Sequence, residues 1–133
     1  IPLYDITAAA GLTSTYNSSN NILDFIQIPN LPRCDGAIYV KGDSMYPLLK
    51  HGDIVAFQRL VDLPEEIDFG NMYVVDMSTP HLERIYVKYV QKSEKGDDYV
   101  KLVSYNEKHH AEKHVLLKKI RAMAAVKASI RLS

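Results

Sequence analysis

The sequence predicts a mainly β domain of several short antiparallel strands, and three observations support this class. Runs of β-favouring residues are short and are separated by turn residues such as Gly, Pro and Asn. Residues 84–92 and 98–106 flank the turn sequence SEKGD, a pattern that is typical of a β-hairpin. No stretch of the chain has a long helical period.

The elements follow in order along the chain. Residues 1–10 are predicted to be an extended arm, and residues 12–21 are almost all small or polar, which is typical of a flexible loop. Residues 44–50 are predicted to form one or two helical turns, and residues 61–71 a loop. Strands are predicted at 22–29, 37–42, 53–60, 72–77, 84–92 and 98–106.

The last strand is predicted from a period of two. Apolar residues recur at every second position from Ile120 to Ile130, with Arg121, Lys127 and Arg131 at alternate positions. This alternation favours a strand, although the many alanines leave a helix possible.

Length and composition restrict the class of protein. The 133 residues suit one domain, 22–133, preceded by an arm and loop, 1–21. Sixteen basic and sixteen acidic residues balance, so no basic field argues for nucleic-acid binding by this segment. A single cysteine suits a reducing cytoplasm, and no apolar run approaches the roughly 18 residues of a membrane span. The chain begins with Ile rather than Met, so we expect that a segment precedes it.

The stretch YVKGDSMYPLLKHGDIV, residues 39–55, places Ser44 in a turn after a predicted strand. Ser44 either caps a short helix or presents a reactive hydroxyl, and a reactive serine needs a base. Of the five histidines, only His51 is near Ser44 in sequence, and the other four lie in polar, turn-like stretches. No Asp-His-Ser order is recognisable, although a triad can be scattered in sequence.

Lys88 is the other candidate base. A lysine amine becomes neutral when desolvation lowers its pKa. In RIYVKYV, Lys88 shares one strand face with Tyr86 and Val90, and apolar residues occupy the other face, so we expect a strand that is buried on both sides. The alternative is a lysine on a partly solvated face whose aliphatic stem packs while its amine reaches water.

These residues together resemble the LexA-like self-cleaving repressors, which use a Ser–Lys dyad. The resemblance rests on GDSMYPLLKHGDIV and the later IYVKYV, and it is supported by three further segments: IPLYDITAAAGL, MYVVDM and IRAMAAVKASI. It covers nearly the whole chain and implies a fold like that of LexA and the signal peptidases.

The resemblance assigns roles to individual residues. It implies that Ser44 is the nucleophile, that Lys88 is its general base, and that the backbone N–H groups of Asp43 and Ser44 form the oxyanion hole. Ala10 and Gly11 match the scissile pair, although AAAG is also compatible with a plain hinge. The turn around the nucleophile would be shaped by Gly42, Met45 and Pro47. No metal and no other cofactor is expected.

The resemblance also implies partners. We expect a homodimer formed through the C-terminal strand, and operator DNA bound only through an N-terminal helix-turn-helix domain upstream of this chain. A RecA-type nucleoprotein filament is a candidate trigger for cleavage, and no membrane partner is expected.

Two other functions are compatible with the sequence. One is a soluble hydrolase like the signal peptidases, which share the serine motif but act on other chains at a membrane. The other is a non-catalytic dimerisation or sensor module in which Ser44 caps a helix and Lys88 is structural. The segment NEKHHAEKH fits no standard zinc spacing, so a solvated turn is favoured there over a metal site.

Overall fold

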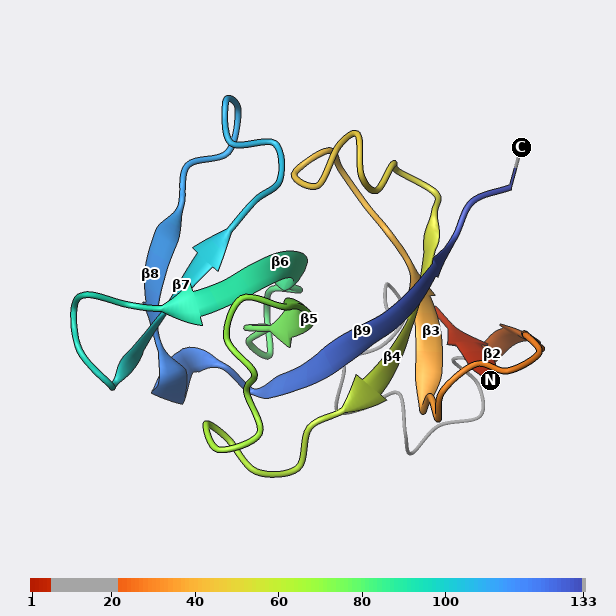
Figure 1. Cartoon of the computed structure of the whole chain (residues 1–133), viewed down its shortest axis with the longest axis horizontal. Coiled ribbons are helices and arrows are strands. Elements are labelled where there is room, and N and C mark those ends of the chain that lie inside the picture. The colour runs from red at the N-terminus through yellow and green to blue at the C-terminus, as the bar shows by residue number, and fades with distance from the viewer. Residues whose placement is uncertain (6–21, 133) are drawn as a thin grey trace.

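A single open sheet of nine strands forms the core of the computed structural model, which describes residues 1–5 and 22–132. The strand order is β2-β1-β3-β4-β9-β5-β6-β7-β8, and β1 and β3 are parallel while the other neighbours are antiparallel (Figure 1). The strands are β1 Pro2–Tyr4, β2 Ile22–Phe25, β3 Gly36–Tyr39, β4 Ile54–Arg59, β5 Met72–Asp76, β6 Ile85–Lys92, β7 Tyr99–Val103, β8 Lys113–Leu116 and β9 Ala122–Ile130.

The predicted fold class is confirmed. All six internal strands predicted from the sequence form, each within a few residues of its expected ends, and the alternating C-terminal segment is a strand. Two strands were not predicted: β1 lies in the expected arm, and β8 lies where a polar turn was expected. A 3-10 helix, η3 Leu117–Lys119, connects β8 to β9.

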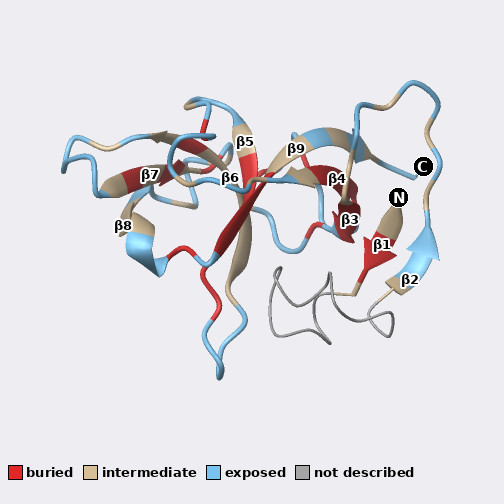
Figure 2. Cartoon of the chain, turned by 90° about the horizontal axis from the view of Figure 1, so that it is seen from below, coloured by how far each residue is buried: buried red, intermediate tan, exposed pale blue. Residues whose placement is uncertain are grey.

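Strand β9 joins the two halves of the sheet. Its residues 124–130 pair with β4 and its residues 122–125 pair with β5, so it crosses the molecule diagonally in Figure 1. Apolar side chains gather in one cluster around Val55 and Phe57 of β4 and in another around Val90 of β6 and Val100 of β7. Figure 2 shows the buried residues concentrated in these central strands, whereas β2 at the sheet edge is largely exposed.

The first strand fixes the base of the N-terminal arm. Tyr4 is 7% exposed, and its ring packs on Gly36, where a Cβ would lie 2.6 Å from the Tyr4 ring and 2.9 Å from that of Phe57. Glycine is therefore required by close packing at this position of β3. Strand β1 also pairs with β2, the strand that follows it in the described part of the chain.

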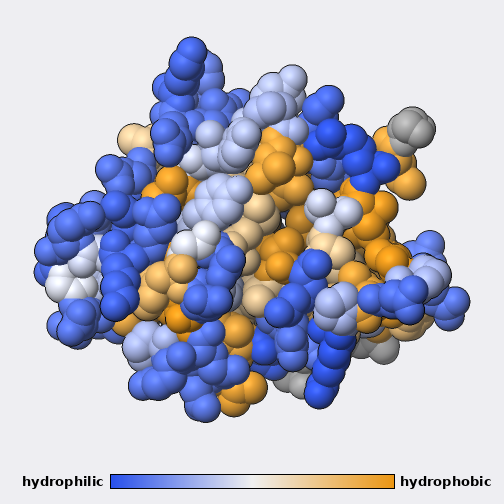
Figure 3. All heavy atoms as spheres, viewed as in Figure 1, coloured by the Kyte–Doolittle hydropathy of each residue, from blue (hydrophilic) through white to orange (hydrophobic). Residues whose placement is uncertain are grey.

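Polar and apolar surfaces are both present on the face shown in Figure 1. In Figure 3 an apolar band runs through the middle of this face, with hydrophilic side chains on both sides. Among the residues described, no helix has the length and apolar character needed to cross a bilayer.

Candidate active site

Residues 42–49, here called the nucleophile turn, connect β3 to the segment that leads into β4. Gly42 has φ +78°, a left-handed conformation that favours glycine. Within the turn, Tyr46 N donates to Asp43 O at 3.0 Å, and Leu49 N donates to Met45 O at 2.8 Å. The second bond closes one helical turn after Ser44, as the sequence predicted, and no regular helix follows.

Met45 anchors the nucleophile turn in the core. Its side chain is 2% exposed and belongs to the same cluster as Leu49, Val55 and Phe57. Ser44, the preceding residue, is only half-buried and lines a small groove of 60 Å³ with Tyr39 of β3 and other neighbours. The turn therefore has one fixed residue in the core and, beside it, a serine that substrate can reach.

An ion pair fastens the far end of the turn. Asp53 is 6% exposed, and its carboxylate accepts hydrogen bonds from Lys50 N at 2.9 Å and from the guanidinium of Arg131 at 2.8 to 3.1 Å. Arg131 also donates to the carbonyl oxygens of Pro47 and Leu48. The hydrogen bonds from Arg131, and after them the one from Lys50 N, hold the pKa of Asp53 below its ordinary value. The end of the chain after β9 thus supports the turn that carries Ser44.

Residues 105–112, here called the clamp loop, connect β7 to β8 and hold the nucleophile turn from the other side. Asn106 N donates to Ser44 O at 2.9 Å, and Asn106 Nδ2 donates to Asp43 O at 3.1 Å. His110 Nε2 lies 2.6 Å from Asp43 Oδ1, and the hydrogen bond between them lowers the pKa of Asp43. The two loops lie along the same edge of the molecule in Figure 1, so residues more than sixty positions apart are joined at the candidate nucleophile.

Lys88 lies on β6, and its amine meets a buried hydroxyl. Nζ donates to Ser104 Oγ at 2.6 Å and lies 5.9 Å from the centre of the Tyr86 ring. Burial and then the nearby charge of Lys113 lower the pKa of Lys88, while the charge of Asp43 partly opposes this shift. The expectation that this strand is buried on both sides is wrong: most of β6 is half-exposed, because its neighbours cover each face only in part.

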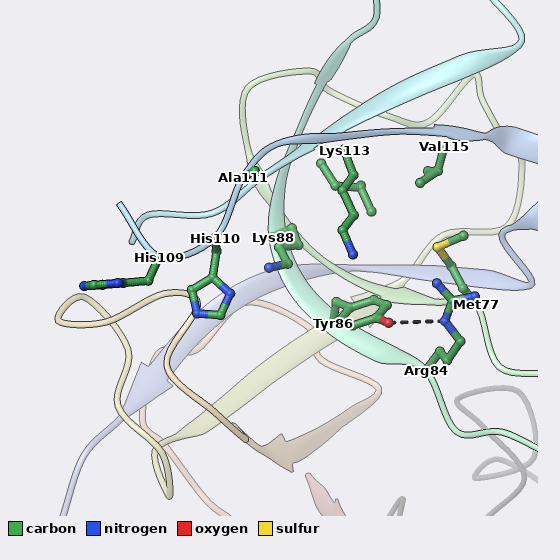
Figure 4. A pocket seen from close by; sticks show the side chains of 10 residues that line it. Met77, Arg84, Tyr86, Lys88, His109, His110, Ala111, Lys113 and Val115 are labelled. Carbon is green, nitrogen blue, oxygen red and sulfur yellow. Dashed lines mark hydrogen bonds between the residues drawn. The ribbon is translucent and has the colours of Figure 1, made fainter. Parts of the chain in front are cut away.

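The amine faces a cavity of 320 Å³, here called the Lys88 cavity. Figure 4 shows Lys88, Lys113 and Tyr86 directed into it from β6 and β8, with His110 beside the amine. Tyr86 lines both this cavity and the groove of Ser44, so the two spaces are neighbours that share a residue of β6. The lining consists of Met77, Arg84, Tyr86, Lys88, Leu102, His109, His110, Ala111, Lys113 and Val115.

The predicted dyad residues lie on adjoining spaces, but no hydrogen bond joins them. Within the described residues, Ser44 Oγ makes no hydrogen bond, and the Lys88 amine bonds to Ser104 instead. The N–H group of Ser44 donates no hydrogen bond in the described part of the chain, whereas the N–H group of Asp43 interacts with the carboxylate of its own side chain. Ala10 and Gly11 lie outside the described residues.

Three residues of the site were not predicted: Ser104, Asn106 and His110. Ser104 is 2% exposed, but nothing in its sequence context separates it from other strand-end serines. His110 stands in a run of polar residues, and only the fold brings it to Asp43. The histidine-rich loop forms no metal site in the described residues, where no group of three or more His, Cys, Asp or Glu side chains is placed to hold an ion.

Comparison with known proteins shows which family the chain belongs to. No curated protein matches the chain at a significant level. The sequence profile described as Peptidase S24-like matches residues 2–127, which is nearly the whole chain. That family comprises serine peptidases and includes the C-terminal domains of LexA-like and phage repressors, so the resemblance seen in the sequence is confirmed. The chain therefore belongs to the Peptidase S24-like family.

Proposed function

We propose that this chain is the self-cleaving and dimerisation domain of a LexA-like repressor, and that it hydrolyses the Ala10–Gly11 bond in its own arm. The observation that carries the proposal is the Lys88 amine, whose pKa is lowered in a half-buried site that adjoins the groove of Ser44. A lysine whose pKa is lowered by its surroundings can act as a general base near neutral pH.

The reaction follows serine acyl transfer. Neutral Lys88 removes the Ser44 proton, and Oγ attacks the Ala10 carbonyl carbon. The charge that develops on the carbonyl oxygen is stabilised by the N–H groups of Asp43 and Ser44, once the Asp43 N–H turns from its own carboxylate to the substrate oxygen. The Lys88 ammonium then protonates the Gly11 nitrogen, which leaves, and water hydrolyses the acyl-enzyme to a carboxylate at Ala10. Attack on the arm of the same chain needs no substrate binding from solution, which raises the effective concentration.

Lys88 has to reach Ser44 for the first step. We infer that the bond to Ser104 holds the amine in a waiting position at the boundary of the two spaces. Rotation about the bonds of the lysine side chain moves Nζ without moving β6. An arm that docks in the groove also displaces water from the serine, and this strengthens the electrostatic interactions at the site.

The same proposal covers the role in repression. Cleavage would separate this domain from an N-terminal helix-turn-helix domain that binds operator DNA, and each half-site would lose its dimeric linkage. A RecA-type nucleoprotein filament is the proposed trigger. The proposed dimer uses the C-terminal strand, where residues 126–130 pair with β4 but lie beyond the pairing of β9 with β5. Sedimentation equilibrium tests it, and a chain that stays monomeric at high micromolar concentration contradicts it.

Intact-mass measurement after alkaline incubation tests the cleavage. We expect loss of the segment that ends at Ala10, and no loss in Ser44→Ala or Lys88→Ala. Ser129→Ala, an exposed serine of β9, is the matched control and should cleave like wild type.

A non-catalytic module is the second candidate. The bond between Lys88 and Ser104 favours it, because a lysine that serves only packing would also satisfy its amine locally. An unchanged mass of the wild-type chain at every pH, with the fold intact, would support this candidate over self-cleavage.

A further inference from the structure

The Lys88 cavity is lined by cations that lack acidic partners. In the residues that the structure describes, Arg84 and Lys113 form no ion pair with a carboxylate, although Arg84 Nε donates to Tyr86 OH at 3.2 Å. Lys88 and His110 complete the basic side, and none of the residues that line the cavity is acidic. His110 is paired with Asp43 outside the lining, so Arg84 and Lys113 provide most of the uncompensated positive charge.

Part of the lining is apolar. Met77, Leu102 and Val115 lie among the lining residues, so the space combines cationic and hydrocarbon groups. Its 320 Å³ lies at the lower end of the range for small-molecule sites. A carboxylate on a short apolar chain fits both surfaces, because cations without an acidic partner favour an anion that accepts their hydrogen bonds.

We propose that the Lys88 cavity is a carboxylate site, and that its occupant is the new C-terminal carboxylate that cleavage creates at Ala10. This inference rests on the proposed function. Residues 6–21 contain no Asp or Glu, so before cleavage that segment has no acidic side chain to offer the cavity. Hydrolysis makes one carboxylate in it, on the short apolar run Ala8, Ala9 and Ala10, and makes it at Ser44, whose groove adjoins the cavity.

Occupancy would change the chemistry of the site. A carboxylate near the Lys88 amine favours the ammonium form, so it opposes the burial and the Lys113 charge that lower the pKa of the amine. The product would therefore switch off the base that made it. After self-cleavage the site would stay inactive with the product bound, so the acyl-enzyme would not re-form and other chains would not be cut.

Binding can be measured without any cleavage by using the full Ser44→Ala chain. The probe is N-acetyl-Ala-Ala-Ala with a free carboxylate, and the readout is the NMR methyl signals of Met77, Leu102 and Val115. We expect saturable shifts, with binding roughly tenfold weaker for the same peptide as a C-terminal amide. Adding Lys113→Gln or Arg84→Gln to the Ser44→Ala chain should weaken binding of the peptide acid by a similar factor. Lys118→Gln, at an exposed lysine of η3, should leave that binding unchanged.

The outcomes separate the possible sources of the anion. Equal binding of acid and amide, no binding at millimolar peptide, or indifference to both Lys113→Gln and Arg84→Gln would overturn the carboxylate site. If butyrate binds as tightly as the peptide acid, the cavity takes free carboxylates and the assignment to the Ala10 product is overturned. Charge-dependent binding in Ser44→Ala together with a wild-type chain that never cleaves would refute the proposed function and leave a carboxylate site.

Discussion

Lys88 Nζ donates a hydrogen bond to Ser104 Oγ at 2.6 Å, and this bond ties the candidate base on β6 to the residue that follows β7. Ser104 is almost fully buried, so its position is fixed by the packing around it. The amine therefore has a defined resting place beside the groove of Ser44 rather than a free range in solvent.

Replacement of this hydroxyl should slow cleavage. Ser104→Ala removes the acceptor that keeps the Lys88 amine at a defined position near the groove, so the amine reaches Ser44 less often and we expect about a tenfold lower maximal rate. The charged amine also loses stabilisation, so the midpoint of the pH profile should move to lower pH. Ser104→Thr keeps a hydroxyl and should restore part of the rate. Ser93→Ala, a serine at the far end of the same hairpin, is the control, and an unchanged midpoint in Ser104→Ala contradicts the contact's role.

Removal of either of two charges near Lys88 should shift the pH profile of the cleavage rate, and the two shifts should have opposite directions. The charge of Lys113 lowers the pKa of Lys88 and the charge of Asp43 raises it. Cleavage requires the neutral amine, so Lys113→Gln should shift the midpoint to higher pH and Asp43→Asn should shift it to lower pH. Rates measured by intact mass across a pH series provide the test, with Lys118→Gln as control. Shifts of the same sign in both variants would contradict the arrangement.

The clamp loop should matter to rate more than to stability. Asn106→Ala removes the bond from Nδ2 to Asp43 O but leaves the bond from its backbone N–H to Ser44 O. We expect cleavage to slow by about tenfold, because small displacements of a nucleophile are costly, while the melting temperature changes little. Glu107→Ala, at the next residue and exposed, is the control. A rate equal to that of wild type would show that the turn does not need this support.

The ion pair between Asp53 and Arg131, which supports the nucleophile turn, should contribute to the stability of the fold. The pKa of Asp53 is lowered in the fold, so its contribution is present above the unfolded pKa, about 3.9, and is lost as pH falls through the folded value. Asp53→Asn should therefore lower the melting temperature by several degrees at neutral pH, and its difference from wild type should shrink in acid. Asp97→Asn, in the exposed turn after β6, should have little effect. A difference that stays constant with pH would contradict the pairing with Arg131.

The strands could be predicted because each carries a local signal. The hairpin of β6 and β7 and the alternation in β9 are patterns of neighbouring residues, and they form as expected. Strand β8, residues Lys113–Leu116, was missed because Lys113 and His114 are polar and because, among the described strands, it lies at the edge of the sheet beside β7. Strand β1 was missed because three residues give no period, and its stability comes from Tyr4 packed on Gly36.

The site was predictable only in part. Ser44 and Lys88 stand in recognisable sequence patterns, whereas Ser104, Asn106 and His110 act through contacts that only the folded sheet creates. Alternate residues of a strand share a face, and this alternation correctly predicted that Lys88 lies on the same face of β6 as Tyr86, since both side chains line one cavity. It overstated the burial of β6, because a strand near the end of an open sheet is covered less than a central one.

The pH dependence of self-cleavage tests the role of Lys88 most directly. The rate at which intact mass is lost from the wild-type chain should rise from neutral to alkaline pH and then level off as the amine becomes neutral, and Lys88→Ala should abolish it. A rate that stays flat or falls over that range, while circular dichroism shows the sheet intact, would contradict an uncharged lysine as the base.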